Sequence, residues 1–178
     1  MYIDNVLKVK NEWWRYIIGC FVVFIATQIG SIPFIIAIFS KAGLEGAAKI
    51  DQTSMMTILG DSNLTFFYVL LTFLFGLIGL FLVVKYLHDQ SFVSISTSRK
   101  KINFSKIANS FLVACSIILI TTITSYLISP DDYEYNFELK PFLILCLISF
   151  LLVPIQTSWE EYMFRGYLMQ GIGAIVKN

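Results

Sequence analysis

The chain alternates between long apolar stretches and shorter polar connections. No Lys, Arg, Asp or Glu occurs in four of these stretches, at residues 16–39, 64–84, 107–129 and 141–159. A helix needs roughly 20 residues to cross a hydrocarbon core about 30 Å thick, and each stretch is close to that length. A soluble helical bundle would instead carry a charged stripe along every helix. The pattern predicts an all-α, polytopic transmembrane helical bundle, a single membrane domain over residues 1–178 with spans at approximately 16–39, 64–84, 107–129 and 141–165.

The composition agrees with a membrane protein and excludes a nucleic-acid-binding one. Apolar residues make up 57% of the chain and charged residues 14%, with a mean hydropathy of +0.74. Soluble domains carry about 25% charged residues. The net charge is +1, and no basic patch interleaved with aromatic residues is present to bind a phosphate backbone. We therefore expect the lipid bilayer as the main partner, and no nucleic acid.

The distribution of basic residues predicts the orientation of the spans. The N-terminal segment and the second connection together hold eight Lys and Arg residues, whereas the first and third connections hold three. Basic connections stay on the cytoplasmic side, so the N-terminus is predicted to be cytoplasmic. Trp13, Trp14 and Tyr16 precede or begin the first span, and we expect their rings in the headgroup zone.

Several residues within the spans carry local predictions. Pro33 is expected to kink the first span. Gly76 and Gly79 would allow another helix to approach the second span closely. The three cysteines lack metal-ligand spacing and are interpreted as buried packing thiols: Cys20, Cys115 and Cys146.

The end of the fourth span carries the candidate chemistry. A helix that starts at Pro141 reaches Glu160 after roughly 28 Å, near the cytoplasmic boundary of the membrane. Glu161 and Arg165 are four residues apart and can form an ion pair, while Glu160 points about 100° away from Glu161. One carboxylate could thus be braced and its neighbour left free to orient water or contact a metal. Alternatively, the charges do no more than set the depth of the helix.

The string Glu-Glu-x-x-Phe-Arg-Gly resembles the first motif of the CPBP intramembrane protease family, which includes the CAAX prenyl endopeptidases and bacterial Abi-like proteins. The matching residues are Glu160, Glu161, Phe164, Arg165 and Gly166. The resemblance implies that Glu160 is a general base on the attacking water and that Glu161 and Arg165 support the geometry of the site. It also implies a divalent metal, zinc or another ion, in the full-length protein.

The chain departs from the family pattern because it lacks the later Phe-x-x-x-His and His-x-x-x-Asn or Asp motifs. Its only histidine, His88, lies just after the second span, where Val84 stands in place of the motif's Phe. We interpret His88 as a solvated residue of a surface loop. We expect the chain to be the N-terminal portion of a longer protein, with no metal held by this portion alone and no hydrolysis by it.

Two functions remain open at this point. The leading one is an intramembrane metal-dependent endopeptidase of a bacterial cell membrane, which cleaves a peptide or small membrane protein near the cytoplasmic face. The alternative is a non-catalytic membrane interaction protein of the bacteriocin-immunity type, which would not need the histidines. A transporter or channel would require polar residues within several spans, and before the fourth span only Gln28 with scattered Ser and Thr supplies any.

Overall fold

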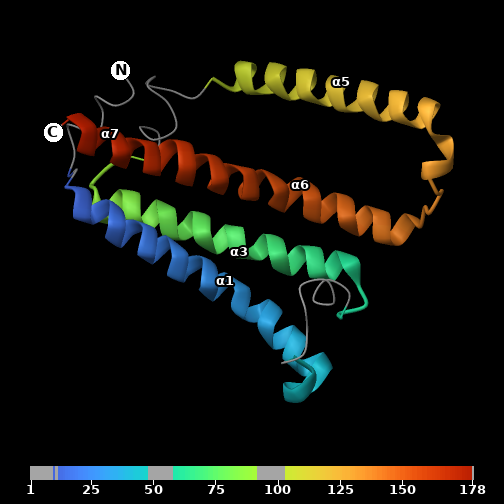
Figure 1. The fold of residues 1–178 in the computed structure, drawn as a ribbon, viewed down its shortest axis with the longest axis horizontal. Helices are drawn as coiled ribbons and strands as arrows, with labels where there is room; N and C mark the ends of the chain where they lie inside the picture. The colour runs from blue at the N-terminus through green and yellow to red at the C-terminus, as the bar shows by residue number, and fades with distance from the viewer. Residues whose placement is uncertain (1–9, 11, 48–57, 92–102, 178) are drawn as a thin grey trace.

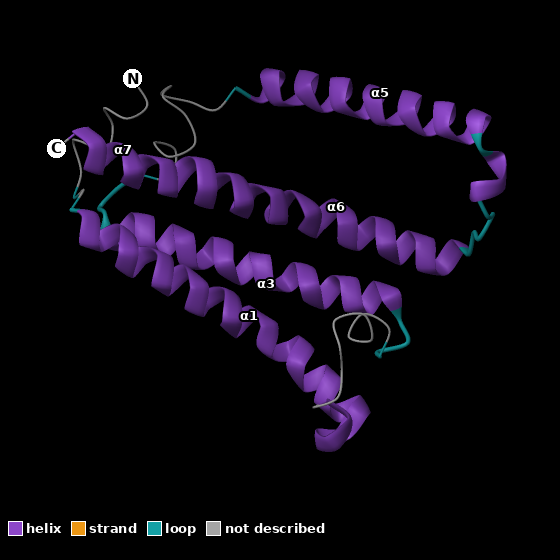
Figure 2. Cartoon of the chain, viewed as in Figure 1, coloured by secondary structure: helices purple, strands orange, loops and turns teal. Residues whose placement is uncertain are grey.

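The computed structural model describes residues 10, 12–47, 58–91 and 103–177, without the side chains of 44–47 and 174–177. All regular elements in these ranges are helical. They are α1 (Trp13–Ala47), α3 (Ser62–Leu82), the π-helix η2 (Val83–Leu87), α5 (Phe104–Ile128), the 3-10 helix η3 (Pro130–Asp132), α6 (Leu139–Glu161), the π-helix η4 (Tyr162–Leu168) and α7 (Met169–Lys177). Figure 2 shows this helical content.

Four helical stretches within the described ranges are long and apolar enough to cross a membrane. They comprise Trp13–Gly43, Ser62–Leu87, Phe104–Ile128 and Leu139–Gly173. Each contains one of the predicted spans or lies within a residue or two of its limits. The all-α transmembrane fold predicted from the charge-free stretches is therefore confirmed.

The four stretches run back and forth, each in the opposite direction to the one before it (Figure 1). The start of α1, the end of η2 and α7 lie at one end, whereas α5 starts nearer the middle of the view. The end of α1, the start of α3, η3 and the start of α6 lie at the other. Helix α3 packs against both α1 and α6. This arrangement brings the first, second and fourth spans together where η2, η4 and α7 meet the start of α1.

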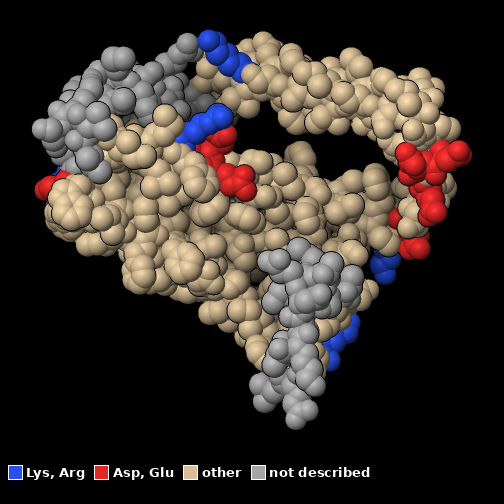
Figure 3. Space-filling view, viewed as in Figure 1, with Lys and Arg blue, Asp and Glu red and all other residues tan. Residues whose placement is uncertain are grey.

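Helix α5 stands apart from the other three long helices. Its main contact is with η3, the next element along the chain, and none of its residues is buried. Figure 3 shows an opening between α5 and the rest of the molecule, with charged side chains at the two ends and a further group of basic and acidic side chains beside this opening. Apolar surface of this extent is typical of contact with lipid or with other membrane helices. The structure is therefore consistent with a bilayer as the surroundings of α5.

Side-chain caps define where two of the spans begin. The Asp61 carboxylate accepts hydrogen bonds from the backbone N–H groups of Asn63 and Leu64 at 2.9 and 3.1 Å. The Asn103 side-chain oxygen accepts one from the N–H of Lys106 at 3.1 Å. Both satisfy N–H groups that the first helical turn leaves without partners. The polar residues that flank the apolar stretches therefore fix the ends of α3 and α5.

Glycines allow α3 to lie close to its neighbours. A Cβ on Gly30 would lie 2.9 Å from the Thr72 Cα, and a Cβ on Gly79 would overlap Ala26. A Cβ on Gly76 would overlap the Trp159 ring nitrogen. The predicted close approach at Gly76 and Gly79 is thus observed, with α1 and α6 as the partners.

The prediction of buried packing thiols was wrong for Cys146, and Cys20 and Cys115 are only half-buried. Helix α1 continues through Pro33, where a kink stays a prediction, and its break lies at Gly43, where φ is 70°; only glycine adopts a positive φ at little cost. Tyr16 is buried among other side chains, because α3 and η4 both pack against its face of α1. Cys146 is exposed, because α6 has a packing partner on one side only.

Candidate functional site

The predicted ion pair at the end of the fourth span is present. Arg165 Nη1 lies 3.1 Å from Glu161 Oε2, and both side chains are more than half exposed. Glu161 is the last residue of α6, and Arg165 lies in η4. An exposed pair of this kind contributes about 0–1 kcal/mol, so its effect is mainly to fix the direction of the Glu161 carboxylate.

Glu160, the adjacent carboxylate, is held much less firmly. It is exposed, and its Oε1 accepts a hydrogen bond from Gln156 Nε2 at a long 3.4 Å. Among the described residues, Glu160 takes part in no ion pair within 4.0 Å. Glu161 is therefore paired, whereas the neighbouring Glu160 can contact solvent or a ligand. The catalytic role of Glu160 stays a prediction.

The backbone that follows these carboxylates is a π-helix. Element η4 contains Phe164, Arg165 and Gly166 of the sequence motif, and the ordinary α-helix resumes at Met169. A π-turn accommodates one more residue than an α-turn and therefore rotates the following side chains by about 100° relative to the preceding ones. π-helices are rare and frequently occur at functional sites.

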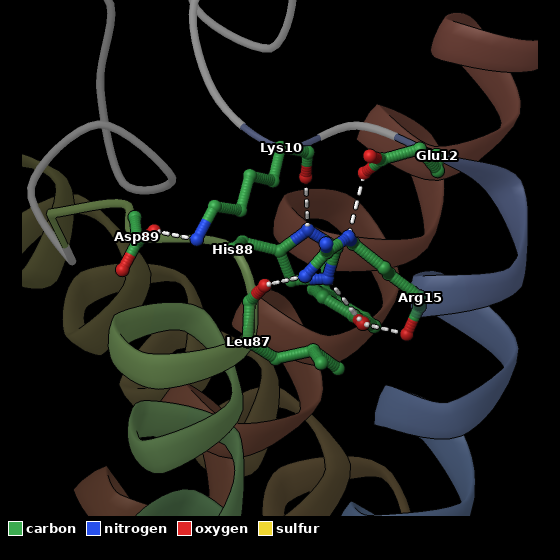
Figure 4. Close-up of polar contacts among 7 residues, drawn as sticks. Lys10, Glu12, Arg15, Leu87, His88 and Asp89 are labelled. Atoms are coloured by element: carbon green, nitrogen blue, oxygen red, sulfur yellow. Dashed lines mark hydrogen bonds and ion pairs between the residues drawn. The ribbon is translucent and has the colours of Figure 1, made fainter.

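His88 is not a solvated loop residue, and that prediction was wrong. Its side chain is 1% exposed. The Lys10 carbonyl lies 2.8 Å from His88 Nδ1, and the Tyr167 hydroxyl lies 2.9 Å from Nε2 (Figure 4). The ring is buried because Tyr16 and Tyr167 pack against it, with ring centroids 4.5 and 5.4 Å away. The His88 N–H closes η2 by donating to the Val83 carbonyl.

These contacts assign the tautomer of His88. A carbonyl oxygen can only accept, so Nδ1 must carry the proton that is donated to Lys10. In the neutral ring, Nε2 then accepts the hydroxyl proton of Tyr167. Burial is the main cause that lowers the pKa of His88, and the nearby Arg15 cation lowers it further. The Lys10 carbonyl and the Glu12 carboxylate oppose this shift. The ring is therefore neutral near pH 7.

Charged residues around His88 fasten the start of α1 to the end of η2. The Arg15 guanidinium donates to Glu12 Oε2 at 2.6 Å and to the Leu87 carbonyl at 2.8 Å. Lys10 forms an ion pair with Asp89, as Figure 4 shows. The first and second spans are thus connected at this end by polar contacts as well as by apolar packing.

Sequence reasoning did not identify the partners of His88 on the fourth span. Tyr167, which bonds His88, is 2% exposed. Gln170, one turn later, makes a separate contact, in which its Oε1 accepts from Gln90 Nε2 at 3.2 Å. The three-residue spacing of Tyr167 and Gln170 places two polar side chains on one helix face, which is a signal of a polar contact within an apolar segment. It does not reveal that the partners lie about 80 residues earlier in the chain.

The described residues do not form a metal site. They contain no group of three or more His, Cys, Asp or Glu side chains that could hold a metal ion. Both ring nitrogens of His88 already have hydrogen-bond partners. The carboxylates of Glu160 and Glu161 could contribute ligands only together with other donors, so we assign no chemical step to a metal.

One curated protein resembles the chain over nearly its whole length. The uncharacterized protein YyaK of Bacillus subtilis strain 168 is 28% identical over 170 residues, which are 95% of this chain and 56% of the relative. No protein-family model matches the chain, and no solved structure matches it. The chain thus spans about half the length of this relative, whose name states no activity.

Proposed function

We propose that this chain belongs to an intramembrane metal-dependent endopeptidase of the CPBP type, with Glu160 as general base and Glu161 and Arg165 as its support. The observation that carries the proposal is the contrast between two adjacent carboxylates. Glu161 is paired with Arg165 at 3.1 Å, whereas Glu160 has one long contact, to Gln156. This is the distribution that the resemblance to the family's first motif implies.

Glu160 would take a proton from the water that attacks the scissile carbonyl. A general base must lie within hydrogen-bond reach of its water, and an exposed carboxylate at the junction of α6 and η4 permits this. The Glu161–Arg165 pair would keep the second carboxylate from competing for that water. A metal, which the resemblance implies, would supply an electrophile, but the described residues do not form a site for one.

The proposed reaction takes place near the cytoplasmic face of a bacterial cell membrane. Glu160 and Glu161 precede η4 and α7, and α7 lies at the end of the molecule that also holds the start of α1 (Figure 1). Trp159, next to them, packs at Gly76 in the middle part of α3, so the carboxylates lie between the middle of the helices and this end. The excess of basic residues in the N-terminal segment and second connection supports a cytoplasmic location for this end; Arg99, Lys100 and Lys101 of that connection lie outside the described residues. The substrate would be a peptide or a small membrane protein.

A non-catalytic interaction protein of the bacteriocin-immunity type is the second candidate. The observation that favours it is α5, a helix of 25 residues with none buried, which offers an apolar surface to a partner in the membrane. Such a protein would not require Glu160.

The test is proteolysis by membranes that contain the protein as its gene encodes it. New peptide N-termini would be mapped by mass spectrometry in membranes with the natural protein, with Glu160→Gln and with Glu138→Gln. The isosteric change at Glu160 removes the base and should abolish the new N-termini. Glu138, an exposed carboxylate that precedes α6 at its opposite end, is the matched control and should have no effect. The proposal would be overturned if Glu160→Gln cleaved as efficiently as the natural protein, or if the natural protein produced no new N-termini.

A further inference from the structure

The described residues include two π-helices, η2 and η4, and a hydrogen bond connects the residue after η2 to a residue within η4. His88 directly follows η2, and its Nε2 accepts from the hydroxyl of Tyr167 within η4 at 2.9 Å. The residues before η4 are the carboxylates of the proposed site. The buried contact is therefore connected to Glu160 and Glu161 through η4, the element that also contains Arg165.

The π-turn decides which way the carboxylates face relative to Tyr167. In a continuous α-helix, residues seven apart lie within about 20° of one another around the axis, so Glu160 and Tyr167 would point in nearly the same direction. The extra residue of η4 separates them by about 100° more. Tyr167 is accordingly buried and Glu160 exposed. The register of η4 thus allows one helix to bury Tyr167 and to expose Glu160.

Tyr167 is well suited to hold that register. Its hydroxyl lies 2.9 Å from His88 Nε2 and 3.4 Å from the Arg15 carbonyl, and its ring centroid lies 5.1 Å from that of Tyr16. Gly19 leaves room for the hydroxyl, because a Cβ there would overlap it. His88 itself is fixed by the Lys10 carbonyl. Tyr167 therefore connects the fourth span to both the first and the second.

We propose that His88 and Tyr167 are positioning residues, which hold η4 in its π-helical register and so direct Glu160, Glu161 and Arg165 away from the packed interface. The importance of this arrangement for catalysis rests on the proposed function. The geometry of the arrangement can be tested independently, because the exposure of residues in η4 can be measured without any substrate. Met163 is 9% exposed and Phe164 is 56% exposed, so these neighbouring positions report a buried and an exposed face of the turn.

The experiment measures thiol labelling at single cysteines placed at Met163 or Phe164, in membranes, with the native cysteines replaced by alanine. In the natural background, the cysteine at 164 should react with maleimide much faster than that at 163. Tyr167→Phe and His88→Leu each remove the hydrogen bond, and labelling at 163 should then become about tenfold faster, as expected for the loss of one buried hydrogen bond. His88→Gln keeps an acceptor for the Tyr167 hydroxyl and should restore protection.

A cysteine at Leu70, which is 1% exposed in the middle of α3, distinguishes positioning from general loosening. The proposal requires that labelling at 70 stay unchanged while labelling at 163 increases. Protection of 163 in both Tyr167→Phe and His88→Leu would overturn it, as would an equal increase at 70 and 163. Loss of proteolysis in the test of Glu160 has no bearing on these rates, so failure of the proposed function and failure of the positioning role can be told apart.

Discussion

Acidification should destabilise this protein through a single side chain. His88 is the only histidine in the chain. Its ring is buried and neutral, with Nε2 accepting from Tyr167. A proton added at Nε2 would face the Tyr167 oxygen, and the hydroxyl would have to turn its own proton to the Arg15 carbonyl, which is farther away at 3.4 Å. The protonated ring would also carry its charge close to the Arg15 cation.

The sign of the effect follows from linkage. The pKa of His88 in the folded state lies below its ordinary value of 6.5, because burial disfavours the charged ring. The unfolded state therefore binds a proton at a higher pH than the folded state does. Stability is fully present above about pH 6.5 and decreases as the pH falls toward the folded-state pKa. Each unit of difference between the two pKa values corresponds to about 1.4 kcal/mol of unfolding free energy.

The assay combines NMR of a single residue with unfolding measurements. Histidine labelled with ¹⁵N gives one set of ring signals, which report the pKa directly and should show the proton on Nδ1 in the neutral form. Unfolding by SDS in mixed micelles, measured from pH 8 to pH 5, gives the change in free energy. His88→Gln cannot titrate and is the matched control, so its unfolding midpoint should vary less over this range.

Three results would refute this reasoning. The first is a folded-state pKa at or above 6.5, which would mean that the ring is solvated or paired with an anion. The second is a natural protein whose stability does not fall between pH 7 and pH 5. The third is an equal fall in His88→Gln, which would assign the effect to other groups.

The remaining predictions concern the ion pair and the helix packing. Arg165→Met should lower the unfolding free energy by less than about 1 kcal/mol in the same SDS assay, because its pair with Glu161 is exposed, while proteolysis should fall well below that of the natural protein; a loss above about 2 kcal/mol would contradict this account of the pair. Gly30→Ala should cost on the order of 1 kcal/mol, because the new Cβ would meet the Thr72 backbone at 2.9 Å and force α1 away from α3, with a partial offset from the higher helix propensity of Ala. Ser31→Ala is its neighbouring control, and equal stability of the two variants would contradict the close packing.

The parts of the fold that depend on local pattern could be predicted from the sequence. The four spans follow from charge-free stretches of membrane-spanning length, and the Glu161–Arg165 pair follows from the four-residue spacing on a helix. Both rest on interactions between residues close in the chain, or between a segment and its solvent. The different directions of Glu160 and Glu161 follow from the same helical geometry, because adjacent residues lie about 100° apart around the axis.

The parts that depend on contacts distant in sequence could not. The position of His88 after a span is typical of a loop, and nothing near it shows that Tyr167 and Lys10 will enclose it. A π-helix has no hydrophobic period of its own, so η2 and η4 leave no trace in the pattern of apolar residues. The separation of α5 is likewise a property of how the helices pack and not of its own sequence.

The account requires that the Glu160–Arg165 turn be exposed at the cytoplasmic side of the membrane, and one labelling experiment tests this directly. A single cysteine at Phe164 would be treated with a membrane-impermeant maleimide in spheroplasts and in inside-out vesicles, beside a control cysteine at Tyr135, which is 91% exposed in the connection before α6. Labelling at 164 only in inside-out vesicles, and at 135 only in spheroplasts, is the predicted result. Labelling at 164 in intact spheroplasts would contradict the account.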